Sequence, residues 1–204
     1  MIDDCTALIL AGGDSRRMGR DKAVLRLGGQ SLLQRTINLM QTLFPVVLLS
    51  VRQPRGGLDA SITQVCDGIS SAGPLAGLYA GLRRATTPWV FAVATDMPYL
   101  RAETILQLAA RRGAHQAVVP IAAGHPQALA AFYAVSALPA FQAALDGAEN
   151  RSLQAALAAL DVCRVDERSL CDADANPQSF IDLDTPEDFA RARRYFGRYT
   201  PQGE

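Results

Sequence analysis

Residues 6–22 read TALILAGGDSRRMGRDK, and this stretch decides how the remaining sequence is interpreted. Its first five residues form a short apolar run that ends close to glycines, as expected of a strand buried on both faces of a parallel sheet. Gly12 and Gly13 lack Cβ atoms, so the backbone after this strand can turn sharply and bring its amides close to phosphate oxygens. The segment predicts a buried strand followed by a phosphate-binding turn.

Four cationic side chains follow the two glycines, namely Arg16, Arg17, Arg20 and Lys22. They are candidates to neutralise the charge of a triphosphate. The spacing matches neither G-x-G-x-x-G nor G-x-x-x-x-G-K-[ST], so it predicts neither a dinucleotide-binding Rossmann site nor a P-loop. Taken alone, the segment fits a glycine turn followed by a solvated basic loop equally well.

Strand-like and helix-like patterns alternate along the whole chain, which is typical of a three-layer α/β fold with a mostly parallel central sheet. Further strands are predicted at residues 46–50, 62–65, 89–94, 118–119 and 129–133. The predicted helices are one capped by Ser31 with Gln34, one opened by Gly73 and Pro74, one marked by Ile105 and Leu108, an alanine-rich region at 136–160 broken at Gly147, and a last helix capped by Thr185. With 204 residues the chain is expected to form a single domain, residues 1–204, with a frayed polar tail at 197–204.

Composition excludes several classes of function. Twenty basic residues balance twenty acidic ones, so no overall field attracts nucleic acid or an anionic membrane. The four cysteines are scattered without metal-ligand spacing and are interpreted as free thiols. The start, MIDDC, is acidic, and no apolar run reaches the length of a membrane span, so a cytoplasmic location is expected.

Two acidic residues follow predicted strands. Asp96 lies just past the carboxyl end of the 89–94 strand, where ligands bind in open α/β sheets. Since Mg²⁺ favours one or two carboxylates plus phosphate oxygens, Asp96 is predicted to be a metal ligand, with an acidic cap or surface turn as the alternative. Asp67 follows the 62–65 strand and, before Gly68, fits an ordinary turn acid.

The segment LAGGDSRRMGRDK resembles the L-A-G-G-x-S-x-R-M-G-x-D-K motif of molybdenum cofactor guanylyltransferases, within the Rossmann-like nucleotidyltransferases. The similarity continues through GPLAG at 73–77, TDMP at 95–98, HPQAL at 125–129 and DLDTPEDF at 182–189. The glycine-loop motif alone indicates the superfamily, whereas GPLAG points to the molybdopterin branch.

The resemblance implies transfer of GMP from GTP to molybdopterin with Mg²⁺ and release of pyrophosphate. It implies catalytic roles for Lys22, Arg17 and Asp96, a metal ligand at Asp96, and nucleotide contacts at Leu10, Ala11, Gly12, Gly13, Lys22, Ser50, Asp67 and Asp96. Asp67 would hold guanine, since one carboxylate can accept from both the N1 and N2 donors of that base. Transient contacts with molybdopterin-carrying proteins and molybdoenzymes are expected, with no nucleic acid or membrane partner.

The sequence departs from the family pattern at two places. Ser50 stands where asparagine is usual, and Asp182 and Asp184 replace the usual N-x-N-T-P, so a second carboxylate either approaches the metal or caps the last helix. The D-x-D-T-P form also occurs in related cytidylyltransferases, which leaves a CTP-using enzyme as an alternative, beside a non-catalytic nucleotide-binding subunit. His125 is predicted to position substrate, and His115 to be a surface residue.

Overall fold

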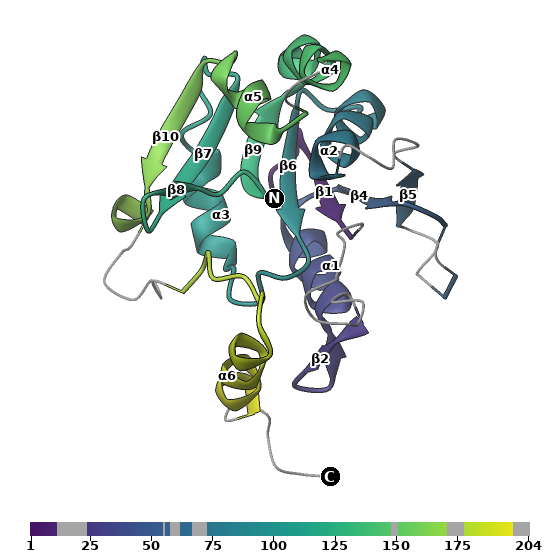
Figure 1. Ribbon diagram of the computed structural model, residues 1–204, viewed down its shortest axis with the longest axis vertical. Helices are drawn as coiled ribbons and strands as arrows, with labels where there is room; N and C mark the ends of the chain where they lie inside the picture. The colour runs from purple at the N-terminus through teal and green to yellow at the C-terminus, as the bar shows by residue number, and fades with distance from the viewer. Residues whose placement is uncertain are drawn as a thin grey trace.

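The computed structural model describes residues 1–11, 24–54, 56–57, 62–66, 73–147, 151–170 and 178–197. Its central feature is an eight-stranded sheet with the order β10-β7-β9-β6-β1-β4-β5, in which β8 pairs with β7 (Figure 1). The strands are β1 (Cys5–Leu10), β4 (Val46–Val51), β5 (Thr63–Cys66), β6 (Trp89–Ala94), β7 (Ala117–Ala122), β8 (His125–Pro126), β9 (Ala130–Ala134) and β10 (Val162–Asp166).

The first strand lies in the middle of the sheet. All six residues of β1 are buried, and its neighbours β4 and β6 both run parallel to it. The strand β9 runs antiparallel to β6 and to β7, and β10 returns to the parallel direction beside β7. The predicted mostly parallel sheet with a doubly buried first strand is therefore confirmed.

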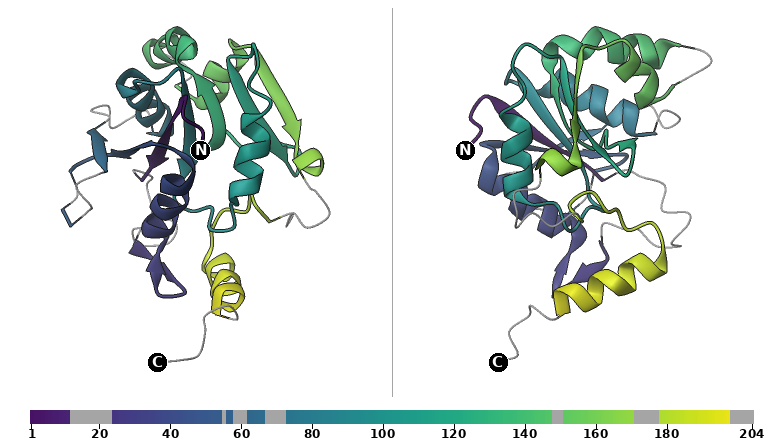
Figure 2. Two further views of the ribbon diagram at one scale, coloured as in Figure 1. Left: turned by 180° about the vertical axis from the view of Figure 1, so that it is seen from behind. Right: turned by 90° about the vertical axis from the view of Figure 1, so that its left-hand side faces the viewer.

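Helices cover both faces of the sheet, giving three layers (Figure 2). On one face lie α2 (Gly73–Arg84), α4 (Leu138–Asp146) and α5 (Leu153–Ala158), and on the other lie α1 (Leu32–Leu43) and α3 (Ala102–Ala109). One face of α1 is buried, and Phe44 at its end stacks on Phe91 of β6 at a centroid distance of 5.6 Å. Alternation of strand and helix has buried one apolar core on each side of the sheet.

The cap of α1 differs in part from the predicted capping box. The Ser31 hydroxyl accepts a hydrogen bond of 3.1 Å from the backbone N–H of Gln34, as expected of a cap. The Gln34 side chain instead donates to Asn38 Oδ1 at 2.8 Å, one turn further along the helix. The reciprocal half of the box is thus replaced by a contact between neighbouring turns.

A small third cluster lies beyond the carboxyl ends of the strands. It joins α6 (Pro186–Gly197) to the hairpin of β2 (Arg26–Leu27) and β3 (Gln30–Ser31), and Figures 1 and 2 show α6 set apart from the layered body. Its buried members are Leu27, Leu32, Tyr99, Leu183 and Ala192, with Phe189 and Phe196 packed against them. The side of α6 that carries Phe189, Ala192 and Phe196 therefore packs against the rest of this cluster.

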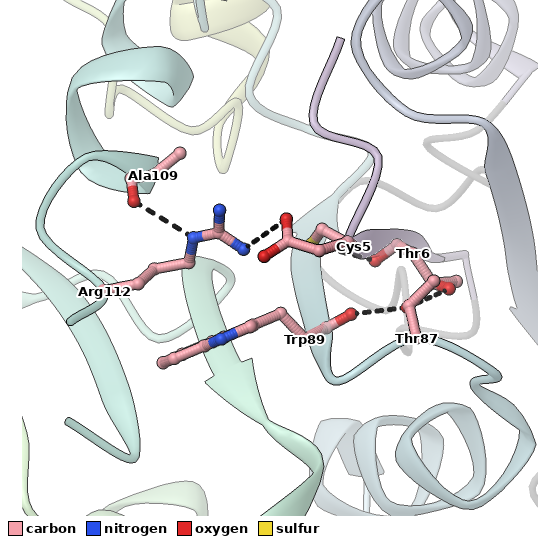
Figure 3. Close-up of polar contacts among 7 residues, drawn as sticks. Cys5, Thr6, Thr87, Trp89, Ala109 and Arg112 are labelled. Carbon is pink, nitrogen blue, oxygen red and sulfur yellow. Dashed lines mark hydrogen bonds and ion pairs between the residues drawn. The ribbon is translucent and has the colours of Figure 1, made fainter. Parts of the chain in front are cut away.

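The opposite edge of the sheet, at the amino ends of β1 and β6, is held by a polar network (Figure 3). Arg112 donates to Asp4 at 2.9 Å and to the carbonyl of Ala109 at 3.0 Å, and its guanidinium lies over the Trp89 ring. The Thr6 and Thr87 hydroxyls share a hydrogen bond of 2.7 Å. These contacts fix the start of the chain far from the carboxyl edge.

Several elements were not predicted. The edge strand β10 follows α5, and the short strand β8 forms a hairpin with β7. Short 3-10 turns, η2 (Val135–Ala137) and η3 (Glu167–Leu170), follow β9 and β10. The alanine-rich region does form helices on both sides of Gly147, as predicted. Among the helices that the structure describes, none is long and apolar enough to cross a membrane.

Candidate active site

The carboxyl ends of four parallel strands meet at one edge of the sheet. Leu10, the last residue of β1, pairs with Ser50 of β4 on one side and Ala94 of β6 on the other. Ser50 pairs in turn with Val65 of β5. The backbone N–H of Ala11 donates to the carbonyl of Ser50 at 3.0 Å. The structure thus brings together Leu10, Ala11 and Ser50, three residues predicted to contact a nucleotide.

Asp96 lies at the same edge, two residues beyond β6. It is half-buried between Thr95 and Met97, which are both buried, and its carbonyl accepts a hydrogen bond of 2.9 Å from the backbone N–H of Leu183. That bond brings the Asp182–Asp184 segment against the residue predicted to hold the metal. The sequence placed both segments in the family motif but gave no indication that their backbones are joined.

The other predicted site residues lie outside the described residues: Gly12, Gly13, Arg17, Lys22 and Asp67. The elements that lead to them do reach the carboxyl edge. The glycine segment follows Ala11, and Asp67 follows Cys66, whose neighbour across the β4–β5 ladder is Val51. Their individual roles remain predictions, while the strands that precede them, β1 and β5, end at the same edge of the sheet on either side of β4.

The GPLAG segment forms the start of α2 and has a structural explanation. Gly73 has a φ of +53°, a left-handed conformation that favours glycine. A Cβ at Gly77 would lie 2.6 Å from Ser50 Oγ and 3.0 Å from Leu10 Cδ2, so only glycine lets the helix approach the ends of β1 and β4 so closely. The second glycine of the motif therefore shapes the wall beside the predicted nucleotide site.

The carboxylates at this edge suit a hard cation that takes most of its ligands from a bound substrate. Within the described ranges, no group of three or more His, Cys, Asp or Glu side chains is placed to hold a metal ion. Mg²⁺ commonly uses only one or two carboxylates and takes its remaining ligands from phosphate and water. The Asp96 carboxylate, with Asp182 and Asp184 in the adjoining segment, fits that requirement.

The last helix has its own cap. The Thr185 hydroxyl accepts from the N–H of Asp188 at 3.1 Å, while the Asp188 carboxylate accepts from the N–H and hydroxyl of Thr185 at 3.0 and 2.7 Å. The hydrogen bond from the Thr185 side chain is the main reason that the pKa of Asp188 is lowered. Thr185 is thus confirmed as the cap, and a metal role for Asp182 or Asp184 stays a prediction.

The two histidines lie at opposite edges. His125 is exposed in β8, which follows the carboxyl end of β7 through a turn with positive φ at Ala123 and Gly124. The N–H of Ala123 donates to Glu167 Oε1 at 2.9 Å, which fixes this turn. His115 precedes β7, is partly exposed and contacts Asp161 at 3.1 Å. His125 therefore lies at the edge where substrate is expected, and its role in positioning substrate stays a prediction.

The cysteines follow the prediction where they are described. Cys5, Cys66 and Cys163 are free, and Cys171 lies outside the described residues. Cys5 is buried in β1, and burial raises the pKa of its thiol to about 12. A thiol with such a pKa stays protonated at neutral pH and is a poor nucleophile.

Known proteins are similar to this chain in sequence and in fold. Residues 7–162 match the family model described as the MobA-like NTP transferase domain. A probable molybdenum cofactor guanylyltransferase from Opitutus terrae is 42% identical over 159 residues, covering 74% of this chain and 77% of the relative. The molybdenum cofactor guanylyltransferase of Rhodobacter capsulatus is 33% identical over 189 residues, covering 91% and 93% of the two chains.

Solved structures agree with the sequence comparison. The crystal structure of molybdopterin-guanine dinucleotide biosynthesis protein A from Archaeoglobus fulgidus aligns with a TM-score of 0.81 at 25% identity, covering 95% of this chain and 99% of that one. The fold and the carboxyl edge therefore define a nucleotidyltransferase of the Rossmann-like class. The chain belongs to the MobA-like NTP transferase family, among relatives named as molybdenum cofactor guanylyltransferases.

Proposed function

We propose that this protein transfers GMP from GTP to molybdopterin, releasing pyrophosphate. The observation that carries the proposal is the meeting of the glycine-loop strand, Ser50 and Asp96 at one sheet edge, in a chain similar over most of its length to molybdenum cofactor guanylyltransferases. The reaction is assigned to the cytoplasm, with transient contacts to molybdopterin-carrying proteins and molybdoenzymes, as further parts of the same proposal.

The reaction requires alignment more than covalent catalysis. A phosphate monoester has a second pKa of about 6, so the terminal phosphate of molybdopterin is largely ionised at neutral pH and needs no general base. One of its oxygens forms a bond to the α-phosphorus of GTP while the bond from that phosphorus to the β-bridging oxygen breaks. Holding the two reactants in line contributes much of the rate enhancement.

Three residues are assigned to bind the metal and to neutralise the negative charge of the phosphates. Asp96 would hold Mg²⁺, which supplies positive charge to phosphate oxygens when bound. Lys22 and Arg17 would bind the triphosphate and stabilise the charge that grows on the departing pyrophosphate. The Gly12–Gly13 turn would add backbone N–H donors to the same phosphates.

Base selection is assigned to the end of β5. Asp67 follows Cys66, and its carboxylate would accept from the N1 and N2 donors of guanine, which form an adjacent pair that cytosine lacks. Ser50, buried in β4 beside Gly77, would supply a shorter polar contact where relatives are expected to carry asparagine.

The test is pyrophosphate release measured with each of the four NTPs, with and without molybdopterin and Mg²⁺. Release only with GTP, molybdopterin and Mg²⁺ together supports the proposal. A preference for CTP would identify the cytidylyltransferase alternative. Nucleotide binding without release under any of these conditions would identify a non-catalytic subunit.

A further inference from the structure

Arg35 has a buried donor that nothing described in the structure satisfies. It lies in the first turn of α1, and its Nε is buried without a hydrogen-bond partner among the described residues. Arginine stays charged in proteins, and leaving a charged donor buried without an acceptor costs free energy. Burial also lowers the pKa of this guanidinium. An anion bound beside Arg35 would supply the acceptor that its Nε lacks.

Arg35 lines a cavity of about 180 Å³ at the carboxyl edge of the sheet. Its lining also includes Met97 and Pro98, which directly follow Asp96, and Val93, the last residue but one of β6. The remaining lining residues are Thr36, Leu39 and Leu100. The cavity therefore shares a short stretch of backbone with the residue assigned to the metal.

The guanidinium of Arg35 also contacts an aromatic ring, but this contact does not satisfy the buried Nε. Arg35 Cζ lies 4.1 Å from the centroid of the Phe196 ring of α6. Such stacking uses the face of the guanidinium, whereas its N–H donors point outward in the plane of the group. The ring thus holds the group in place without supplying an acceptor.

We propose that this cavity, the Arg35 cavity, binds a phosphate oxyanion. The planar donor fork of arginine matches two oxygens of a phosphate, and the mainly apolar walls strengthen a charged hydrogen bond by excluding water. The choice of phosphate over other anions rests on the proposed function, because phosphates are consumed and released beside Asp96. The anion is either the phosphate monoester of the acceptor or the released pyrophosphate.

A purely structural role for Arg35 makes different predictions. If the residue only braces α6 through Phe196, its loss destabilises the fold and leaves phosphate binding unchanged. If it forms an anion site, replacement by methionine removes a buried donor that has no acceptor, so the unfolding temperature changes little while phosphate binding at the cavity is lost.

The methionines allow the cavity to be observed separately from the glycine loop. The chain has four, Met1, Met18, Met40 and Met97. Met97 lines the Arg35 cavity, Met40 is buried in the core, and Met18 belongs to the basic glycine segment. With ¹³C-methyl methionine labelling, each methyl signal reports its own surroundings.

The experiment titrates the labelled full-length protein, without nucleotide and with a chelator, using inorganic phosphate, pyrophosphate, ethyl phosphate and acetate. The Met97 signal is expected to shift with at least one phosphate compound, and Arg35→Met should weaken that response about tenfold or more. Arg84→Met, an exposed arginine at the end of α2, is the matched control and should leave it unchanged. Arg35→Lys keeps the charge without the planar fork and serves if the methionine variant does not fold.

The preferred compound identifies the source: ethyl phosphate indicates the acceptor group, and pyrophosphate indicates the product. The proposal is overturned if no phosphate compound moves the Met97 signal, if only acetate does, or if the Arg35 variants respond like the control. Because neither turnover nor metal is needed, such a failure leaves the transferase assignment intact. Conversely, a protein without GTP-dependent activity could still bind phosphate in the Arg35 cavity, and the Met97 signal would show it.

Discussion

Leu183 donates its backbone N–H to the carbonyl oxygen of Asp96 at 2.9 Å, joining the segment before the last helix to the end of β6. Because this is a backbone contact, substitution of either side chain need not break it. The carboxylates at 96, 182 and 184 can therefore be tested separately from the fold that brings them together.

Asp96→Asn should reduce turnover by roughly 10²-fold or more, since it removes one charged contact with the reacting centre. The free energy of unfolding should change little, because Asp96 is only half-buried. Initial rates of pyrophosphate release and urea unfolding measure the two effects. Asp146→Asn, at the end of α4, is the control and should leave the rate unchanged. If Asp96→Asn turns over at near the wild-type rate at limiting Mg²⁺, Asp96 is not a metal ligand.

The variants Asp182→Asn and Asp184→Asn test whether either carboxylate binds the metal or instead caps the last helix. A carboxylate that approaches the metal should raise the Mg²⁺ concentration for half-maximal activity when it is neutralised. The helix cap belongs to Thr185 and Asp188, so a metal role predicts altered Mg²⁺ dependence without the stability loss of a cap variant. If neither variant shifts the Mg²⁺ dependence, Asp96 is the only carboxylate of the three with a metal role.

Asp67→Ala should abolish the preference for GTP over CTP. The carboxylate is the group assigned to the paired donors of guanine, and alanine offers no acceptor in its place. A competition assay with both nucleotides measures the ratio of kcat/KM values. Asp161→Ala, which lies before β10 beside His115, provides the comparison. Unchanged selectivity would move base recognition to other residues.

The cap of α6 makes stability depend on pH. The lowered pKa of Asp188 means that its contribution is complete above the ordinary value of 3.8 and is lost as pH falls through the lowered folded-state pKa. Thr185→Ala should cost about 1 kcal/mol at pH 7, and the difference from wild type should shrink in acid. Urea unfolding at pH 7 and at successive values below 4 tests this. A constant difference across that range contradicts the assigned cap.

Much of the fold and part of the site could be predicted from the sequence. The apolar runs at β1, β4 and β6 identified the strands because parallel strands are buried on both faces. The place of Asp96 at the carboxyl edge followed from its position after β6, while its metal role stays a prediction. The β10 edge strand is only partly buried, so its hydrophobic pattern is weak. The Leu183–Asp96 bond, the Arg35 cavity and the Gly77–Ser50 approach depend on how distant segments pack, which no local pattern encodes.

Two glycines of α2 allow the close approach to be tested at two depths. A Cβ at Gly77 would lie 2.6 Å from Ser50 Oγ, at the nucleotide edge, whereas a Cβ at Gly81 would clash with the Leu8 side chain, deeper in the core. Overpacking typically costs about 1–3 kcal/mol, offset by about 1 kcal/mol from the better helix propensity of alanine. Gly81→Ala should therefore lower stability with little effect on the KM for GTP.

Gly77→Ala should instead raise the KM for GTP. The new methyl group displaces the hydroxyl of Ser50, and Ser50 is a residue assigned to nucleotide binding. Adding Ser50→Ala removes the oxygen that clashes, while the Cβ of residue 50 lies 3.5 Å away, an ordinary contact. The double variant should recover part of the stability lost by Gly77→Ala, because the tight contact of 3.0 Å with Leu10 Cδ2 remains, and it should not regain the contact assigned to Ser50 and nucleotide. Steady-state kinetics and urea unfolding on all four proteins separate these effects. If Gly77→Ala and Gly81→Ala change KM equally, the Gly77 contact has no special connection with nucleotide binding.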